Sequence, residues 1–264
     1  MKWREAWQRA RPTLEGVVRG RAPGSEAGVE LAFLDWGGDG ELIAFHHANG
    51  FGAATFAIVA AGLRERFRVI AFDARGHGDS TPVPARQDPD AYRWPRLAAD
   101  YAAALASVVE STGRDRVRLA IGHSFGGVLT LAAAAERPGL IEEALLLDPV
   151  ILPPPAPAPA PGAAQREAPG AELAAATRRR RAVFPSREAA YEHFAGRELF
   201  RDFPPEALAL YVAEGLAETS SGELRLKCDP QMAARMPDAR VEVCEGGRLF
   251  PLEQPELVLE RNEL

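Results

Sequence analysis

The run Gly122-His123-Ser124-Phe125-Gly126 has the residue types and the spacing of a serine nucleophile held on a sharp turn between a strand and a helix. A serine raised above a sheet in this way occupies a strained backbone position. Side chains two residues before and two residues after it would collide with the crossing helix and strand, so both positions require glycine. A serine that only caps a helix is the alternative, which the order of strand, turn and helix around Ser124 disfavours.

The elements around this run indicate a chain of alternating strands and helices. Apolar runs bounded by Gly, Asp and Asn predict strands, and apolar residues at helical spacing predict helices. The predicted strands are 29–35, 41–46, 67–73, 117–121 and 144–148, and the predicted helices are 3–10, 53–66, 97–108 and 126–136. This alternation implies an α/β fold with a mostly parallel central sheet and helices on both faces.

A Pro-rich segment then interrupts the pattern. Residues 153–162 read PPPAPAPAPG, which can only be extended. Beyond it, helices are predicted over 178–184, 188–194 and 205–216, and a helical insertion after a strand end commonly caps a site. We therefore predict a core of residues 1–152 and 229–264, with a Pro-rich linker and helical cap at 153–228. For the four arginines at 178–181, a solvated helix face is favoured over a site for an anionic substrate.

The composition of the 264 residues, 47% of them hydrophobic with a net charge of −6, suits one sizeable α/β domain. It gives no reason to expect a nucleic acid or an anionic membrane as partner. Cys228 and Cys244 are the only cysteines, which excludes a disulfide framework and a Cys-rich metal site. We expect a cytoplasmic protein without a signal peptide, membrane span, metal or other cofactor. The oligomeric state has no signal in the sequence.

Three segments resemble the α/β-hydrolase superfamily, in its esterase- and lipase-like branch with a helical cap. They are residues 46–51 (HHANGF), residues 73–80 (DARGHGDS) and the run around Ser124. Asp148-Pro149-Val150 also fits the end of the strand before the cap. The resemblance covers residues 28–150 well and the cap more loosely. It implies the α/β-hydrolase fold and a serine hydrolase acting on an ester or related acyl substrate.

The same resemblance implies roles for residues near Ser124. The loop after the first central strand would supply one main-chain N–H of an oxyanion hole from Asn49, with Ala48 standing where glycine is usual. Phe125, which follows the nucleophile, would supply the second. Residues 73–80 resemble a structural turn of the family, so architecture is favoured over catalysis for them. A serine at the elbow argues against dehalogenase or epoxide hydrolase chemistry, in which the family uses aspartate.

The chain departs from the family where the catalytic base is expected. The family order is serine, acid, histidine, and residues 245–253 match the turn that carries the histidine, with Arg248 in its place. A guanidinium keeps its proton, so Arg248 cannot be a general base. His193 is the only histidine after Ser124, and its helical surroundings favour packing over catalysis.

The C-terminal region is also shorter than the family pattern. One strand at 240–245 and one helix at 255–264 fit after Cys228, whereas the family has two such units. The unit that usually carries the catalytic acid is therefore expected to be missing. Asp148 remains as an alternative acid, and the strand at 240–245 is predicted to pair beside the strand at 144–148.

These features predict a serine hydrolase whose activity through Ser124 is weak or absent. A histidine that precedes the elbow remains open as a substitute base, the candidates being His46, His47, His77 and His123. The alternative function is a non-catalytic protein that binds a small molecule on the same fold, and a third possibility is a degraded chain without function.

Overall fold

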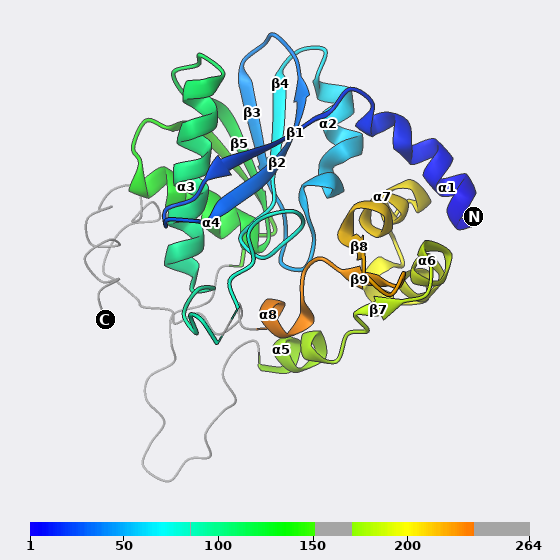
Figure 1. The fold of residues 1–264 in the computed structure, drawn as a ribbon. Coiled ribbons are helices and arrows are strands. Elements are labelled where there is room, and N and C mark those ends of the chain that lie inside the picture. Colours follow the sequence, from blue (N-terminus) through cyan, green and yellow to red (C-terminus); the bar gives the residue numbers. More distant parts are fainter. Residues whose placement is uncertain (85, 151–170, 235–264) are drawn as a thin grey trace, which may run out of the picture.

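The computed structural model describes residues 1–84, 86–150 and 171–234 of the protein (Figure 1). Its central element is a six-stranded sheet with the strand order β1-β2-β4-β3-β5-β6. The strands are β1 (Val18–Pro23), β2 (Glu30–Gly37), β3 (Leu42–His46), β4 (Arg68–Phe72), β5 (Val117–His123) and β6 (Ile141–Leu147). Strands β4, β3, β5 and β6 run parallel to one another, and β1 and β2 are antiparallel to their neighbours.

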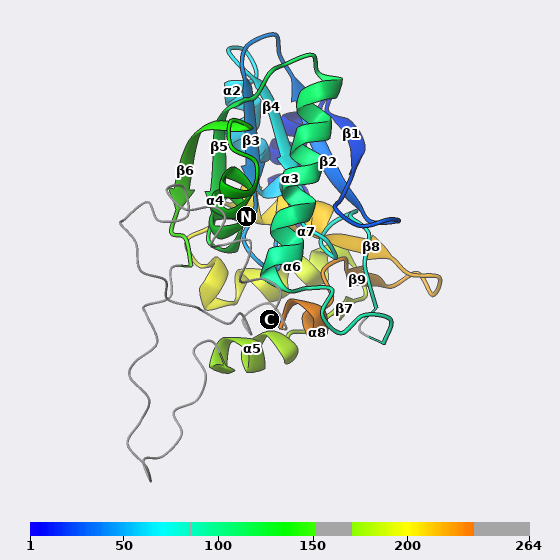
Figure 2. The same ribbon diagram turned by 90° about the vertical axis from the view of Figure 1, so that its left-hand side faces the viewer.

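Helices cover both faces of this sheet, as predicted. Figures 1 and 2 place α3 (Trp94–Ser111) and α4 (Phe125–Glu136) on one face and α2 (Ala57–Leu63) on the other. Side chains of successive residues in β3 point to opposite faces of the sheet, as they do in any strand. Ile43 belongs to the core beneath α2, and Leu42 belongs to the core beneath α3 and α4. The predicted mostly parallel α/β architecture is therefore confirmed.

The predicted strands coincide with β2 to β6, but β1 was not predicted. Its sequence, VRGRAP, lacks an apolar pattern because this edge strand is largely exposed. Gly20 of β1 lies opposite Phe33 of β2, and a methyl group added to Gly20 would lie 2.2 Å from the Phe33 ring. The aromatic ring thus covers the glycine, which explains a glycine within a strand. Pairing with β2, and not local propensity, defines β1.

Residues 171–233 form a smaller layer beyond the carboxyl-terminal ends of the parallel strands, as both views show. We call it the 171–233 layer. It contains a three-stranded antiparallel sheet of order β7-β9-β8. Its elements are α5 (Ala171–Arg178), β7 (Val183–Phe184), α6 (Arg187–Ala195), α7 (Pro205–Gly215), β8 (Leu216–Glu218), β9 (Leu224–Leu226) and α8 (Pro230–Ala233).

One predicted helix of this layer is wrong. The segment 178–184 is not helical, since α5 ends at Arg178 and β7 pairs with β9 through Val183 and Phe184. The arginine run offers no apolar face at helical spacing, and pairing with a strand some 40 residues later decides its conformation. The helices predicted at 188–194 and 205–216 correspond to α6 and α7.

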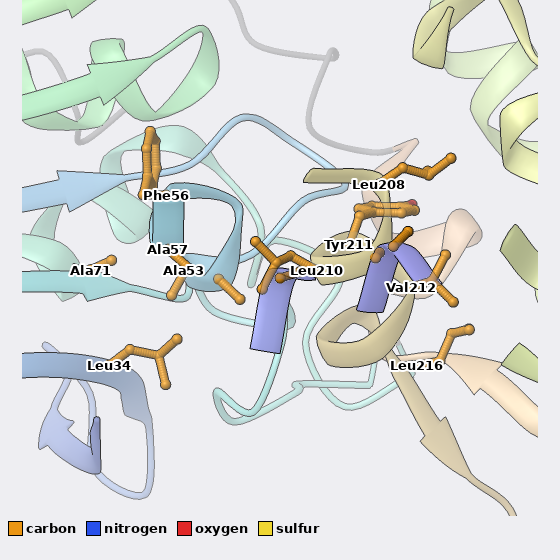
Figure 3. Packing of buried hydrophobic residues seen from close by; sticks show 14 of the residues in the cluster. Leu34, Ala53, Phe56, Ala57, Ala71, Leu208, Leu210, Tyr211, Val212 and Leu216 are labelled. Atoms are coloured by element: carbon orange, nitrogen blue, oxygen red, sulfur yellow. The ribbon is translucent and has the colours of Figure 1, made fainter. Parts of the chain in front are cut away.

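The 171–233 layer is joined to the body by apolar packing. Figure 3 shows Leu210 of α7 facing the short 3-10 helix η2 (Ala53–Phe56), which precedes α2. The N-terminal helix α1 (Trp3–Ala10) packs against α6 and α7, and its Trp3 ring lies 5.9 Å from that of Tyr191. The helix predicted at 3–10 is therefore confirmed, and it packs on the body of the protein. The predicted strand at 240–245, its pairing and the helix at 255–264 lie outside the described residues.

Among the described residues, no helix combines the length and the apolar character that crossing a bilayer demands.

Candidate active site

Ser124 stands at the junction of β5 and α4 with φ 52° and ψ −118°, a conformation that residues with a side chain rarely adopt. Its N–H donates to the carbonyl of Leu147 at 2.8 Å, and its carbonyl accepts from Gly127 at 2.9 Å. Such a backbone position costs about 1–3 kcal/mol and persists only where the surrounding structure enforces it. Ser124 therefore lies on a strained turn between strand and helix.

The two glycines of the run are required by close backbone contacts. A methyl group added to Gly122 would lie 2.4 Å from the carbonyl oxygen of Gly126. A methyl group added to Gly126 would lie 2.3 Å from the carbonyl oxygen of His46 and 2.5 Å from that of His47. The end of β3 and the loop that follows it thus pack directly on the turn that carries Ser124.

Two main-chain N–H groups near this turn have no acceptor in the part of the chain that the structure describes. Phe125 is the first residue of α4, so its N–H has no partner within the helix. Asn49 follows the end of β3, and its side chain is anchored by a hydrogen bond from Nδ2 to the carbonyl of Ala233 at 2.9 Å. These are the two donors that the sequence assigned to an oxyanion hole.

Asp148 lies beside the same turn. It follows Leu147, whose carbonyl accepts from Ser124, and its own backbone is also strained, with φ 44°. A methyl group added to Gly127 would lie 3.2 Å from Pro149, so the segment after β6 packs on the start of α4. The backbone of Asp148, the candidate acid, therefore lies close to the backbone of Ser124, the candidate nucleophile.

Three of the four histidines that precede the elbow, His46, His47 and His77, form a buried group, whereas His123 at the end of β5 is only partly buried. The rings of His46 and His47 lie 5.3 Å apart, and those of His47 and His77 lie 4.9 Å apart. His47 accepts from the N–H of Ala74 at Nε2 (2.9 Å), so its Nδ1 donates to the carbonyl of Ala48 (2.8 Å). His77 accepts from the N–H of Gly50 at Nε2 (3.0 Å).

These contacts give the buried histidines a structural role. His47 and His77 tie the loop that carries Asn49 to the turn at 73–80, and sequence reasoning found the residues but not this role. No hydrogen bond joins an imidazole of the described residues to the Ser124 hydroxyl. Burial lowers the pKa of His46 to about 3 and that of His47 to about 4, and it lowers the pKa of His77 well below its ordinary value.

We expect the free energy of unfolding to fall as the pH is lowered from 7 to 5. Unfolded histidines take up protons below pH 6.5, whereas folded His46 and His47 do so only near pH 3–4. The unfolded state therefore binds more protons in this range, and stability that is present above pH 6.5 is lost on acidification. At pH 5 these two residues together lower the free energy of unfolding by about 4 kcal/mol.

One buried carboxyl acts in the opposite direction. Burial raises the pKa of Asp73 to about 6, so on acidification this carboxyl binds its proton in the folded state before it does so in the unfolded state. At pH 5 this offsets about 1 kcal/mol of the loss of stability caused by the histidines. Urea unfolding at pH 7, 6 and 5 measures the net slope. A His46→Phe variant should show a shallower slope, because its unfolded state has one histidine fewer to protonate in this range. An unchanged slope in that variant would contradict the assignment.

The turn at 73–80 is architectural, as favoured from the sequence. The Asp73 carboxylate accepts from the N–H of Ala53 at 2.7 Å and from that of Asp79 at 3.0 Å. The Ser80 hydroxyl donates to the Asp73 carbonyl at 2.7 Å and accepts from the N–H of Ala32 at 2.8 Å. These bonds hold η2, β2 and the turn together.

His193, the only histidine after Ser124 in the sequence, is held away from any hydrogen bond with Ser124. His193 lies in α6, where its ring is 5.3 Å from those of Phe184 and Phe194 and one nitrogen is 3.4 Å from Arg197. This is the packing role that its helical surroundings indicated. Arg248, the residue at the expected position of the base, lies outside the described residues.

Arg180 is the residue that sequence reasoning placed wrongly. The run 178–181 was expected on a solvated helix face, and Arg178 and Arg179 are indeed exposed. Arg180 lies instead in the turn after α5, half-buried, with Nη2 donating to the Tyr211 hydroxyl at 2.6 Å. Nothing in the sequence separates this arginine from its neighbours, because its partner lies 31 residues later.

A pocket borders the loop after Asn49, with Gly50, Phe51 and Tyr211 in its lining, and Ser124 is not among the residues that line it. Two ion pairs lie among the charged side chains at this pocket. Lys227 lies 2.7 Å from Asp79, and Arg19 lies 2.8 Å from Glu214.

Within residues 1–84, 86–150 and 171–234, no three His, Cys, Asp or Glu side chains lie close enough together to bind a metal ion.

The sequence is similar to those of known enzymes over part of its length. The chain is 38% identical over 102 residues to a bifunctional esterase/perhydrolase of Acinetobacter calcoaceticus, covering 38% of this chain. It is 32% identical over 111 residues to 2-(acetamidomethylene)succinate hydrolase of Mesorhizobium japonicum, covering 42% of this chain. The matched stretches span only 33% and 36% of these two relatives' own lengths.

Solved structures share the fold over a larger part of the chain. The crystal structure of E-2-(acetamidomethylene)succinate hydrolase superposes with a TM-score of 0.63 and 23% identity, over 90% of this chain and 76% of that one. A thioesterase domain from the curacin biosynthetic pathway superposes with a TM-score of 0.61 and 19% identity, over 90% and 78% of the two chains. The sequence profile of the alpha/beta hydrolase family matches residues 43–261, which is most of the chain. This protein is therefore a member of the alpha/beta hydrolase family.

Proposed function

We propose that this protein is a serine hydrolase that acts on an ester or related acyl substrate through Ser124. The strained backbone of Ser124 carries the proposal, because a positive φ at a non-glycine residue between β5 and α4 has an energetic cost that a plain helix cap avoids. Membership of the alpha/beta hydrolase family and the similarity to an esterase/perhydrolase support it.

In the proposed reaction the Ser124 hydroxyl oxygen attacks the carbonyl carbon, the bond to the leaving oxygen breaks, and the hydroxyl proton passes to that oxygen, which gives an acyl-enzyme and a free alcohol. The N–H groups of Asn49 and Phe125 donate to the oxygen that becomes negative. Each such donor is worth about 3–4 kcal/mol in comparable sites. Water then attacks the acyl carbonyl, which releases the acid and restores the serine.

Proton transfer is the weak step of this proposal. The Ser124 proton has no imidazole acceptor among the described residues, and the sequence places Arg248 where the family has histidine. Asp148 is the candidate acid. In a complete triad the acid orients the histidine that accepts the serine proton, and in the part of the chain that the structure describes no such histidine links Asp148 to Ser124. Sites that keep the oxyanion donors but lose a member of the triad retain about 10³–10⁴-fold acceleration over water. We therefore expect slow hydrolysis.

The missing imidazole also favours a second candidate function. A site with oxyanion donors and an unactivated serine can hold an acyl compound without turning it over. In that case the protein is a small-molecule-binding protein on the same fold. We propose for both functions that the 171–233 layer caps the site, that the partner is a small molecule, and that the protein works in the cytoplasm.

We expect a fluorophosphonate probe to label the intact protein and to leave a Ser124→Ala variant unlabelled. The reason is that the probe forms a covalent bond only with a serine oxygen that can attack phosphorus. A Ser221→Ala variant is the matched control, because Ser221 is an exposed serine in the turn between β8 and β9. Mass spectrometry of the labelled peptide reports the site.

Two results would count against the hydrolase proposal. Equal labelling of Ser124→Ala would place the reactive group elsewhere. Absence of labelling, together with saturable binding of a short acyl ester that is recovered unchanged, would favour the binding protein.

A further inference from the structure

Arg180 brings a positive charge to the loop that carries the candidate oxyanion donor Asn49. The next residue, Gly50, has φ +82°, and a methyl group added to it would lie 2.8 Å from Arg180 Nη1. The guanidinium therefore lies directly against the open face of Gly50. Arg180 and Asn49 come from segments about 130 residues apart, and the fold places them next to one another.

The guanidinium is held in one orientation by the 171–233 layer. Its Nη2 donates to the Tyr211 hydroxyl at 2.6 Å. The Tyr211 ring is only 5% exposed and lies 5.2 Å from Phe51, 5.2 Å from Phe194 and 5.0 Å from Phe200. An arginine fork fixed through a buried tyrosine loses little further freedom when it binds a ligand.

The charge of Arg180 has no counter-ion in the described part of the chain. No carboxylate there lies within 4 Å of its nitrogens, whereas the buried Arg75 is paired with Asp100 at 2.6 Å. The titratable neighbours are neutral, since burial raises the pKa of Cys228 to about 12 and raises that of Tyr211. A half-buried cation without a partner is costly, and a guanidinium has five N–H donors to satisfy.

We propose that Arg180 binds a carboxylate on the acyl part of the substrate, so that the protein selects monoesters of short dicarboxylic acids. The inference rests on the proposed function, because it takes Asn49 as a donor to the scissile carbonyl oxygen. Gly50 and Asn49 are adjacent, about 3.8 Å apart at Cα, so the bound carboxylate and the scissile carbonyl lie close together. A planar fork pairs with a carboxylate through two parallel hydrogen bonds.

The experiment compares two esters of equal acyl length, monoethyl glutarate and ethyl pentanoate, by titration of released acid at constant pH. We expect a higher kcat/KM for the charged ester. The Arg180→Gln variant should lower the ratio of the two kcat/KM values by about 10- to 100-fold, the worth of one hydrogen bond to a charged group. Arg180→Lys keeps the charge and should recover part of the ratio.

The matched control is Arg179→Gln, which removes an exposed arginine of the same run and should leave the ratio unchanged. If Arg180 only holds the turn after α5 on Tyr211, Arg180→Gln will lower the melting temperature and affect both esters alike. That result overturns the inference and leaves the proposed function standing.

If neither ester is hydrolysed, the proposed function fails and binding decides the inference. Isothermal titration of the intact protein with monoethyl glutarate then replaces turnover as the measurement. Saturable binding that Arg180→Gln weakens at least 10-fold upholds the carboxylate site. Absent binding, or binding of equal strength in the variant, overturns it.

Discussion

We expect Gly126→Ala to lower hydrolysis at least 100-fold and to reduce the free energy of unfolding by about 1–3 kcal/mol. The added methyl group would lie 2.3 Å from the carbonyl oxygen of His46 and 2.5 Å from that of His47. Neither oxygen can move freely, since both belong to the backbone at the end of β3. The turn must therefore open, which carries Ser124 away from the N–H of Asn49.

Gly62→Ala is the matched control for this substitution. Gly62 lies within α2 and has no atom within contact distance of an added methyl group. Alanine is favoured over glycine inside a helix by about 0.5–1 kcal/mol, so this variant should be slightly more stable and equally active. Thermal unfolding and ester hydrolysis measure both variants. Full activity of Gly126→Ala would show that Ser124 does not depend on a close contact with β3.

We expect Asp100→Asn to reduce the free energy of unfolding by about 3–5 kcal/mol. Arg75 and Asp100 are both fully buried, and their side chains form two parallel hydrogen bonds of 2.6 and 2.9 Å. The substitution leaves the guanidinium with only the half-exposed carboxylate of Glu26, at 3.0 Å, as counter-ion. A buried charge that has lost its partner is one of the largest single destabilising changes in a protein.

An exposed ion pair provides the control for this variant. Glu5→Gln breaks the pair with Arg9 on the surface of α1, where both side chains are more than half exposed. Such pairs contribute about 0.3–0.5 kcal/mol. Urea unfolding at constant pH compares the two variants. Equal small losses would show that the Arg75–Asp100 pair does not hold the core.

The Asp100 substitution should also act on the site. Arg75 belongs to the same turn as His77, and His77 accepts from the N–H of Gly50. Gly50 follows Asn49, the candidate oxyanion donor. A turn that loses its buried ion pair can no longer hold that loop in place, so hydrolysis should fall even where the variant remains folded.

The site proposed here joins two parts of the protein with different roles. The sheet and its loops provide Ser124, Asn49 and Phe125, whose arrangement depends on backbone contacts. The 171–233 layer provides Arg180, whose arrangement depends on the side chain of Tyr211. Substitutions of Ser124 should therefore abolish the reaction, whereas substitutions of Arg180 should change the selectivity for substrates.

The sequence by itself determined the elements whose cause is local. The turn at Ser124 requires glycine at position 122 because that residue packs on α4, and at position 126 because that residue packs on the backbone of His46 and His47. Strands β2 to β6 carry continuous or alternating apolar residues, so these strands could be predicted from the sequence, and β2 to β5 are largely buried. The loop at Asn49 and the turn at 73–80 were found by family resemblance, which depends on short runs of residues.

Tertiary structure alone decided the elements whose partners lie far away in the chain. β1 exists because it pairs with β2, and β7 exists because it pairs with β9. The buried state of His47 and His77 depends on amides of Ala74 and Gly50, each 27 residues away. Arg180 differs from Arg178 and Arg179 only through Tyr211. Contacts of this kind depend on the distance between side chains in space, which a linear pattern of residue types does not encode.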